Sequence, residues 1–167
     1  MMSDIVGAVT VRPARDADIA GIVALVNSYA AEAIMLYRSP ESVRMTLHDF
    51  VVAVDSTGAI MACGALKEYS PSLAEVASVA VARDAHGLGL GTAIVAEVER
   101  LACKRGIDEL FALTLTPKFF ESAGYVIGDR AMYPEKIRRD CLKCPRRIRC
   151  NEYCVVRQVQ EAIAVAA

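Results

Sequence analysis

A chain of 167 residues, of which 54% are hydrophobic and 23% charged, is long enough to bury the core of one globular domain. The formal net charge of −1 gives no overall field that would favour nucleic acid or an anionic membrane as a partner. The N-terminus lacks the basic-then-apolar pattern of a signal peptide, and no apolar run approaches membrane-spanning length, so we expect a cytoplasmic protein.

The first half of the chain predicts three strands and two helices. In chain order these are a strand at residues 9–11, a helix that Asp16 caps, a helix that Ser39 caps, strands at 50–54 and 59–66, and a polar connection at 67–72. Ser39 suits an N-cap because Pro40 fits the first helical position and Glu41 then lies in the electropositive first turn. The turn residues at 55–58 separate two apolar runs, which predicts a hairpin.

The second half predicts a buried strand and a long helix, followed by shorter elements. In chain order these are a strand at 73–81, a helix that ends near Gly106, a strand at 110–115, a short helix from Pro117 and an extended segment at 125–127. The order β-α-α-β-β-β-α-β-α-β predicts a fold of the α/β (α+β) class, with one domain over residues 1–135. Residues 155–167 fit either a helix or a strand.

The central feature is the valine-rich run at 76–81 and the segment that follows it, His86-Gly87-Leu88-Gly89-Leu90-Gly91-Thr92. Unpaired N–H groups at a helix N-terminus attract an anion such as a phosphate, and glycines let it approach the backbone closely. A P-loop is excluded because Gly91 is followed by Thr92 and Ala93 instead of lysine and a hydroxyl residue. A dinucleotide-binding loop is disfavoured because its glycine spacing differs and no acidic residue closes the next strand. A glycine-rich turn that binds no ligand remains an alternative interpretation.

The segment from Arg83 to Gly91 resembles the Arg/Gln-x-x-Gly-x-Gly/Ala signature of the GCN5-related N-acetyltransferase (GNAT) family, with His86 where the family usually has arginine or glutamine. The resemblance implies the GNAT fold, a central mixed twisted sheet flanked by helices, and acetyl-CoA as the co-substrate. It implies main-chain contacts from Val79 and Val81 to that co-substrate. The diphosphate contacts that it implies are His86, the backbone of Gly87, Gly89 and Gly91, and the Thr92 hydroxyl.

Acetyl transfer from a thioester to an amine needs a base for the ammonium proton and benefits from an acid for the leaving thiolate. Glu75 lies on the central strand, where many family members place a carboxylate base, and burial would raise its pKa towards the useful range. A structural carboxylate paired with Lys67 is the alternative. Phe120 stands where many family members carry a tyrosine and cannot donate a proton, so Thr114 or Thr116 is the candidate acid.

Three further segments resemble the stand-alone N-acetylglutamate synthases of bacterial arginine biosynthesis. They are Tyr37-Arg38-Ser39-Pro40-Glu41, the run from Leu113 to Tyr125, and Pro134-Glu135-Lys136 with Asp140-Cys141-Leu142-Lys143-Cys144-Pro145. The resemblance implies transfer of the acetyl group to the α-amine of L-glutamate. Two carboxylates need forked cations, so we expect Arg38 to bind one, with Ser39 beside it and Lys118 or a C-terminal arginine as the second cation. The alternatives are another small amine, a protein N-terminus, or a non-catalytic module that senses acyl-CoA or redox state.

Residues 136–167 form a basic, cysteine-rich segment that we expect to pack on the same domain. Its cysteines are Cys141, Cys144, Cys150 and Cys154. Four thiolates could hold structural zinc (Zn) or an iron–sulfur cluster, although the spacing is more compact than in the usual sites. Thiols among many cations are also expected to have lowered pKa values, which would make them redox-active. These three possibilities stay open, as does the oligomeric state, for which a homodimer is one option.

Overall fold

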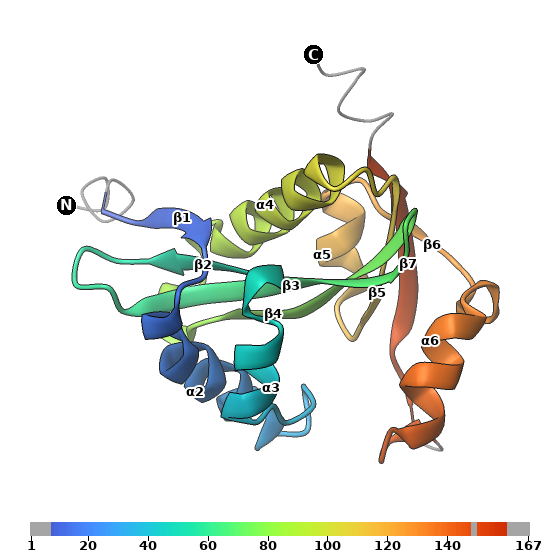
Figure 1. Cartoon of the computed structure of the whole chain (residues 1–167), viewed down its shortest axis with the longest axis horizontal. Helices are drawn as coiled ribbons and strands as arrows, with labels where there is room; N and C mark the ends of the chain where they lie inside the picture. Colours follow the sequence, from blue (N-terminus) through green and yellow to red (C-terminus); the bar gives the residue numbers. More distant parts are fainter. Residues whose placement is uncertain (1–7, 148–149, 160–167) are drawn as a thin grey trace. The chain divides into compact units, whose positions relative to one another are not determined.

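The computed structural model describes residues 8–147 and 150–159. Within them, one sheet has seven strands in the order β1-β2-β3-β4-β5-β7-β6 (Figure 1). The strands are β1 (Thr10–Pro13), β2 (Phe50–Val54), β3 (Ile60–Ser70), β4 (Leu73–Val81), β5 (Glu109–Thr114), β6 (Val126–Ile127) and β7 (Tyr153–Gln158). The helices are α2 (Ile19–Ala30), α3 (Pro40–Met45), α4 (Leu90–Lys104), α5 (Pro117–Ser122) and α6 (Pro134–Arg139). The predicted class, a mixed sheet flanked by helices, is confirmed.

The chain forms two compact units. The first comprises Met1–Leu66 with Val76–Leu101, and the second comprises Lys67–Glu75 with Ala102–Ala167. No helix among the described residues is long and apolar enough to cross a membrane.

The first unit contains the predicted hairpin, in which β2 and β3 pair antiparallel, and β1 pairs antiparallel with β2. Helices α2 and α3 lie side by side in Figure 1, and their apolar faces share one core with the hairpin. Its buried members are Ile19, Ile22, Val26, Val43, Phe50, Val52, Val54, Cys63, Ala65 and Ala80. The predicted cap of α3 is confirmed, since the Ser39 hydroxyl accepts a hydrogen bond from the Ser42 N–H at 3.1 Å.

The second unit is built on β5. This strand pairs in parallel with the start of β4, where Glu75 lies opposite Phe111, and antiparallel with β7 over six residue pairs. The Tyr133 ring stacks on Phe111 with centroids 4.4 Å apart, which anchors the segment that leads into α6.

Two local predictions need correction, and one choice that the sequence left open is decided for the described residues. Asp16 does not cap the helix, because it is the first residue of a 3-10 turn, Asp16–Asp18, that leads into α2. Asp18, which is 4% exposed, accepts hydrogen bonds from the N–H of Arg15, the residue before this turn, and from the Arg12 guanidinium, each at 2.7 Å. The predicted polar connection at 67–72 is largely strand, because β3 continues to Ser70. The C-terminal segment that fitted either a helix or a strand forms strand β7 as far as Gln158, and its last residues lie outside the described ones.

Candidate functional site

The predicted phosphate loop follows β4 in the first unit. A short 3-10 turn, Arg83–Ala85, leads to Gly87 and Gly89, whose φ angles of +82° and +75° are in the left-handed region that favours glycine. A Cβ atom at either position would meet nothing within 4 Å, so the glycines leave open space in front of the loop. Helix α4 begins directly after Gly89, so Gly91 and the exposed Thr92 lie in its first turn. This is the strand–loop–helix geometry of an anion-binding helix N-terminus.

The side chain of His86 is exposed and faces the end of β4. Its Nε2 atom lies 3.0 Å from the Tyr29 hydroxyl and 3.2 Å from the Val81 carbonyl, to which Tyr29 donates at 2.5 Å. Arg83 stacks over the Tyr29 ring and forms an ion pair with Glu32. The loop therefore carries a cation at Arg83 as well as the imidazole of His86, and Tyr29 fixes the strand end from α2.

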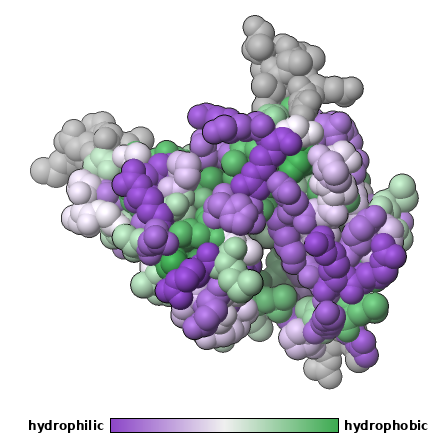
Figure 2. All heavy atoms as spheres, in the orientation of Figure 1, coloured by the Kyte–Doolittle hydropathy of each residue, from purple (hydrophilic) through white to green (hydrophobic). Residues whose placement is uncertain are grey.

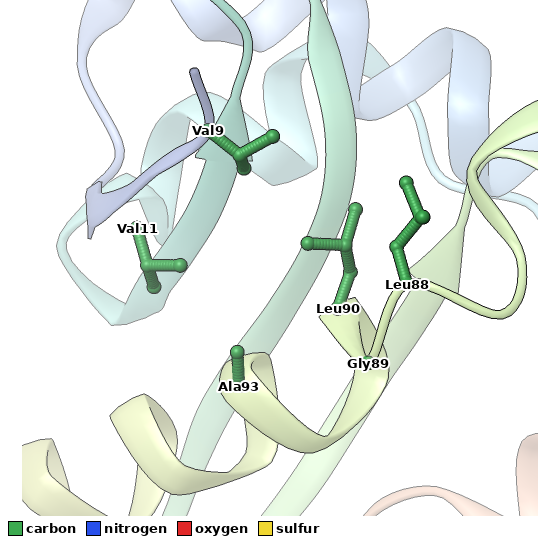
Figure 3. Close-up of a pocket in the computed structure, with 6 residues that line it drawn as sticks. All are labelled: Val9, Val11, Leu88, Gly89, Leu90 and Ala93. Carbon is green, nitrogen blue, oxygen red and sulfur yellow. The ribbon is translucent and has the colours of Figure 1, made fainter. Parts of the chain in front are cut away.

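An apolar hollow lies beside the loop. Figure 3 shows Val9 and Val11 facing it from the β1 segment, with Leu88, Leu90 and Ala93 facing it from the loop and α4. Gly89 completes the lining, so the hollow offers no charged side chain to a diphosphate. The polar contribution of this region comes from the backbone of the loop.

Arg38 occupies a fixed position in the first unit. Its backbone N–H donates to the Asn27 side chain and its carbonyl accepts from the same side chain, both at 2.9 Å. The half-buried guanidinium donates to the Ser42 and Thr46 hydroxyls at 3.2 and 3.3 Å and lies over the Phe50 ring. Burial lowers its pKa, yet an arginine stays charged at any physiological pH. None of the ion pairs between described residues includes Arg38.

Glu75 lies in the second unit and is 5% exposed. Its Oε2 and Oε1 atoms lie 2.9 and 3.1 Å from the Nζ of Lys136 on α6. Glu75 is therefore paired with a lysine, as the alternative interpretation expects, but that lysine is Lys136. The expected partner, Lys67, contacts Asp140 at 2.6 Å. Burial raises the pKa of the Glu75 carboxyl, while the charge and hydrogen bonds of Lys136 act to lower it.

The strand geometry changes after Glu75. Ser78 has a φ of +54°, which is uncommon for a residue other than glycine and interrupts the regular strand. Side chains of a regular strand alternate between the two faces of the sheet, and this alternation does not hold in β4 past Ser78.

Thr114, at the end of β5, is 7% exposed, and its hydroxyl lies 3.1 Å from that of Thr116. Thr114 also accepts from the Thr116 N–H at 2.9 Å, whereas the Thr116 side chain makes no capping hydrogen bond to α5. Phe120 is buried and packs edge-to-face on Tyr125, and Lys118 on α5 is exposed. Of the two candidate acids, Thr114 is the one held in a buried position.

The cysteine segment does not support the zinc prediction. Among the residues that the structure describes, which include all four cysteines, no three His, Cys, Asp or Glu side chains are arranged to hold a metal ion. Burial raises the pKa of the Cys141 thiol, and raises that of Cys154 to about 11. The lowered thiol pKa values expected from the surrounding cations are therefore wrong for these two residues, because burial outweighs charge.

Sequence reasoning missed four polar side chains, two that contact the candidate residues His86 and Glu75 directly and two that are linked to Glu75 through Lys136. They are Tyr29, Tyr69, Lys136 and Asp140. The signal for one pair was present, because Lys136 and Asp140 are spaced i, i+4 in the C-terminal segment that resembles the synthases. Nothing in the local pattern links Lys136 to a strand residue 61 positions earlier.

Known proteins were compared with the chain. A family model described as the acetyltransferase (GNAT) domain matches residues 46–127. An uncharacterised N-acetyltransferase of Chlorobaculum tepidum is 39% identical over 88% of this chain and 94% of its own length. An amino-acid acetyltransferase of Pasteurella multocida is 31% identical over 78% of this chain and 30% of its own length.

Among solved structures, N-acetylglutamate synthase from Neisseria gonorrhoeae, complexed with coenzyme A and N-acetyl-glutamate, superposes with a TM-score of 0.80 at 29% identity. The match covers 90% of this chain and 35% of the synthase. This chain therefore spans about a third of the amino-acid acetyltransferase and the synthase that it matches, but nearly all of the Chlorobaculum protein. Fold, loop and relatives agree, and the chain belongs to the GNAT family of N-acetyltransferases.

Proposed function

We propose that this chain transfers the acetyl group of acetyl-CoA to the α-amine of L-glutamate, the first step of arginine biosynthesis. The observation that carries the proposal is Arg38: a half-buried guanidinium, positioned by Asn27, that forms no ion pair with an acidic side chain of the described residues. A buried cation without an anion is costly unless a ligand supplies the charge. The complex of the similar Neisseria synthase with N-acetyl-glutamate supports a dicarboxylic amino acid as that ligand.

The forked guanidinium suits this role. One carboxylate of glutamate accepts two parallel hydrogen bonds from Arg38, in exchange for contacts that the guanidinium makes to Ser42 and Thr46. The Ser39 backbone and hydroxyl lie beside it, and Lys118 is the second cation. The diphosphate of acetyl-CoA binds the backbone of the loop at Gly87, Gly89 and Gly91, helped by His86 and the Thr92 hydroxyl. Main-chain groups of Val79 and Val81 bind the pantetheine arm.

Acetyl transfer proceeds by direct attack. Glu75 takes one proton from the α-ammonium, directly or through water, and the free amine attacks the thioester carbonyl carbon to form the C–N bond. Collapse of the tetrahedral intermediate breaks the C–S bond, and its electron pair goes to sulfur. As the amide forms, the Thr114 hydroxyl gives its proton to the thiolate and takes the second nitrogen proton in its place, so that this proton in effect passes to sulfur. The products are the N-acetylated amino acid, CoA and the proton that Glu75 releases to water.

The test is an acceptor screen that follows CoA release with each amino acid. L-Glutamate should be the best acceptor, and amino acids without a side-chain carboxylate or amide should react poorly. Arg38→Ala should raise the Michaelis constant for glutamate by well over tenfold, because loss of one partner of a desolvated charge pair costs about 2–5 kcal/mol. Arg38→Lys should restore binding only in part, since a point charge cannot reproduce a two-pronged contact.

Arg44 supplies the matched control, because it is an exposed arginine on α3, the helix that follows Arg38. Arg44→Ala should leave both Michaelis constants unchanged, and neither variant should alter the constant for acetyl-CoA. A monoamine or a peptide N-terminus as the better acceptor would show that the glutamate assignment is wrong.

A further inference from the structure

Lys136 is the most enclosed of the basic side chains on α6. Its side chain is 13% exposed, whereas Arg138 and Arg139 of the same helix are exposed. Figure 2 shows a largely hydrophilic surface over α6. A lysine is seldom buried to this extent unless an anion compensates it. The ammonium contacts both oxygens of Glu75, and it also contacts the Asp140 carboxylate at 3.1 Å, one helical turn further on. Lys136 therefore bridges two carboxylates.

The side chains around Glu75 form a cluster in which positive and negative charges are equal in number. Lys67 and Tyr69 from β3 both donate to Asp140, at 2.6 and 2.5 Å, so that two lysines face two carboxylates. The titratable side chains whose charges interact with Glu75 are Lys67, Tyr69, Lys136, Asp140, Cys141 and Cys154. Lys136 is the one of these that donates hydrogen bonds to Glu75. The ionisation of Glu75 thus depends mainly on one cation from another element.

The position of α6 is itself fixed within the second unit. Tyr133, next to the first residue of α6, stacks on Phe111, which lies opposite Glu75 in the register of β4 and β5. At the other end of the helix, Arg139 donates to the Glu68 carbonyl at 3.2 Å and lies over the Tyr69 ring. With both ends attached, the helix holds the Lys136 ammonium against Glu75.

We infer that Lys136 is a positioning residue for acetyl transfer: it holds the Glu75 carboxylate in place and keeps it ionised, so that it can accept the proton of the amine. This inference rests on the proposed function, because it assumes that Glu75 is the base. The C-terminal segment, which contains Lys136 and Asp140, would then act in the reaction by holding the base, and this role needs no bound metal. Each carboxylate oxygen retains a second lone pair for the incoming proton.

The inference predicts opposite effects for two variants. Lys136→Met removes the cation that most strongly opposes the effect of burial on the Glu75 pKa, so the acidic limb of the pH profile of kcat/KM should move up by about 1–3 pH units. Asp140→Asn removes a carboxylate that repels Glu75, so the limb should move to lower pH. Lys136→Arg keeps the charge and should stay close to the wild-type profile. Lys143→Met removes an exposed lysine outside the cluster and should change nothing.

The experiment measures acetyl-CoA-dependent acetylation of L-glutamate from pH 5 to 9 with the full chain and these four variants, each checked for a cooperative melting curve. Opposite shifts for Lys136→Met and Asp140→Asn support the inference. A Lys136→Met rate that falls by the same factor at every pH, or profiles that coincide for all variants, would overturn it. If Lys136→Met does not fold, the Asp140→Asn variant decides: an acidic limb that moves to lower pH supports the inference, and one that moves to higher pH rejects it.

A second readout separates this inference from the proposed function. The Glu75 carboxyl carbon is titrated by NMR in protein carrying ¹³C-labelled glutamate, and its signal is assigned by its absence in Glu75→Gln. The midpoint should rise in Lys136→Met and fall in Asp140→Asn. If the wild type acetylates another amine but not glutamate, the function proposal is wrong, and the titration still tests Lys136. An unchanged midpoint in Lys136→Met would then reject the positioning role.

Discussion

Gly89 and Gly58 offer a matched pair of positions within the first unit. Both have φ in the left-handed region, +75° and +85°, and a Cβ at either would meet nothing within 4 Å. Valine should therefore cost similar backbone strain at each, about 1–2 kcal/mol. Gly89→Val should in addition raise the dissociation constant for acetyl-CoA at least tenfold, because its side chain enters the space where the diphosphate binds.

Gly58→Val should leave that constant unchanged, since Gly58 lies in the turn between β2 and β3. Calorimetric titration with acetyl-CoA measures both constants, and melting curves report the strain. Equal affinities for the two variants would rule out the loop as the diphosphate site.

At the scale of single residues, the sequence predicted those roles that depend on neighbours in the chain. The Ser39 cap was predictable because it follows from the next two residues. The glycine spacing indicated the short connection from strand to helix, in which Gly87 and Gly89 have left-handed φ angles, and their contact with a diphosphate stays a prediction. The partner of Glu75 was not predictable, because Lys67 is nearer in sequence while Lys136 is brought in by the packing of α6. Burial and charge pairing are properties of the folded chain.

At the scale of elements, α6 is attached through Asp140. Burial acts to raise the pKa of Asp140, but the hydrogen bonds from Lys67 and Tyr69 and the charge of Lys136 outweigh it, so the pKa lies below its ordinary value. A carboxyl with a lowered folded-state pKa contributes stability that is present above its unfolded value of about 3.9 and is lost as the pH falls further. The attachment of α6 should therefore weaken in acid.

Asp140→Asn tests this pH dependence. The variant should be less stable than the wild type at pH 6. The difference should shrink as the pH falls to 3, because the Asp140 carboxyl of the unfolded wild type then takes up a proton, which favours unfolding. Urea unfolding at the two pH values measures the difference. Glu135→Gln, on the same helix, is the control, because Glu135 takes part in none of the ion pairs between described residues. A stability difference independent of pH would contradict the argument.

An element was predictable where the residue types of its segment fit only one structural environment, such as a buried strand. The bounds of β4, residues 73–81, were predicted correctly, because an apolar valine-rich run between turn residues fits a strand buried on both faces. The end of β3 was not, because Lys67 and Tyr69 are polar residues of a kind that loops also contain. They are strand residues because Asp140 of the α6 segment satisfies their polar groups.

At the scale of the whole molecule, the sheet joins distant parts of the chain. Among the residues that the structure describes, the last strand in sequence is internal to the sheet, since β7 lies between β5 and β6 and pairs with both. Local patterns could not place it, because residues 153–158 alternate too weakly to choose between helix and strand. Residues 153–158 form a strand because they pair with β5. The second unit therefore needs residues from both the middle and the end of the chain.

Val155 and Tyr153 test this dependence on the last strand. Both lie on β7, but Val155 is 0% exposed and pairs with Ala112 and Ile127, whereas Tyr153 is 54% exposed. Val155→Asp places an uncompensated charge inside the unit and should lower the free energy of unfolding by about 3 kcal/mol or more. Tyr153→Asp keeps its charge in water and should change that free energy by only about 0.5 kcal/mol. Urea unfolding followed by circular dichroism gives both values. If the two aspartates destabilised the protein equally, β7 would be a peripheral strand, and the C-terminal segment would be separable from the acetyltransferase fold.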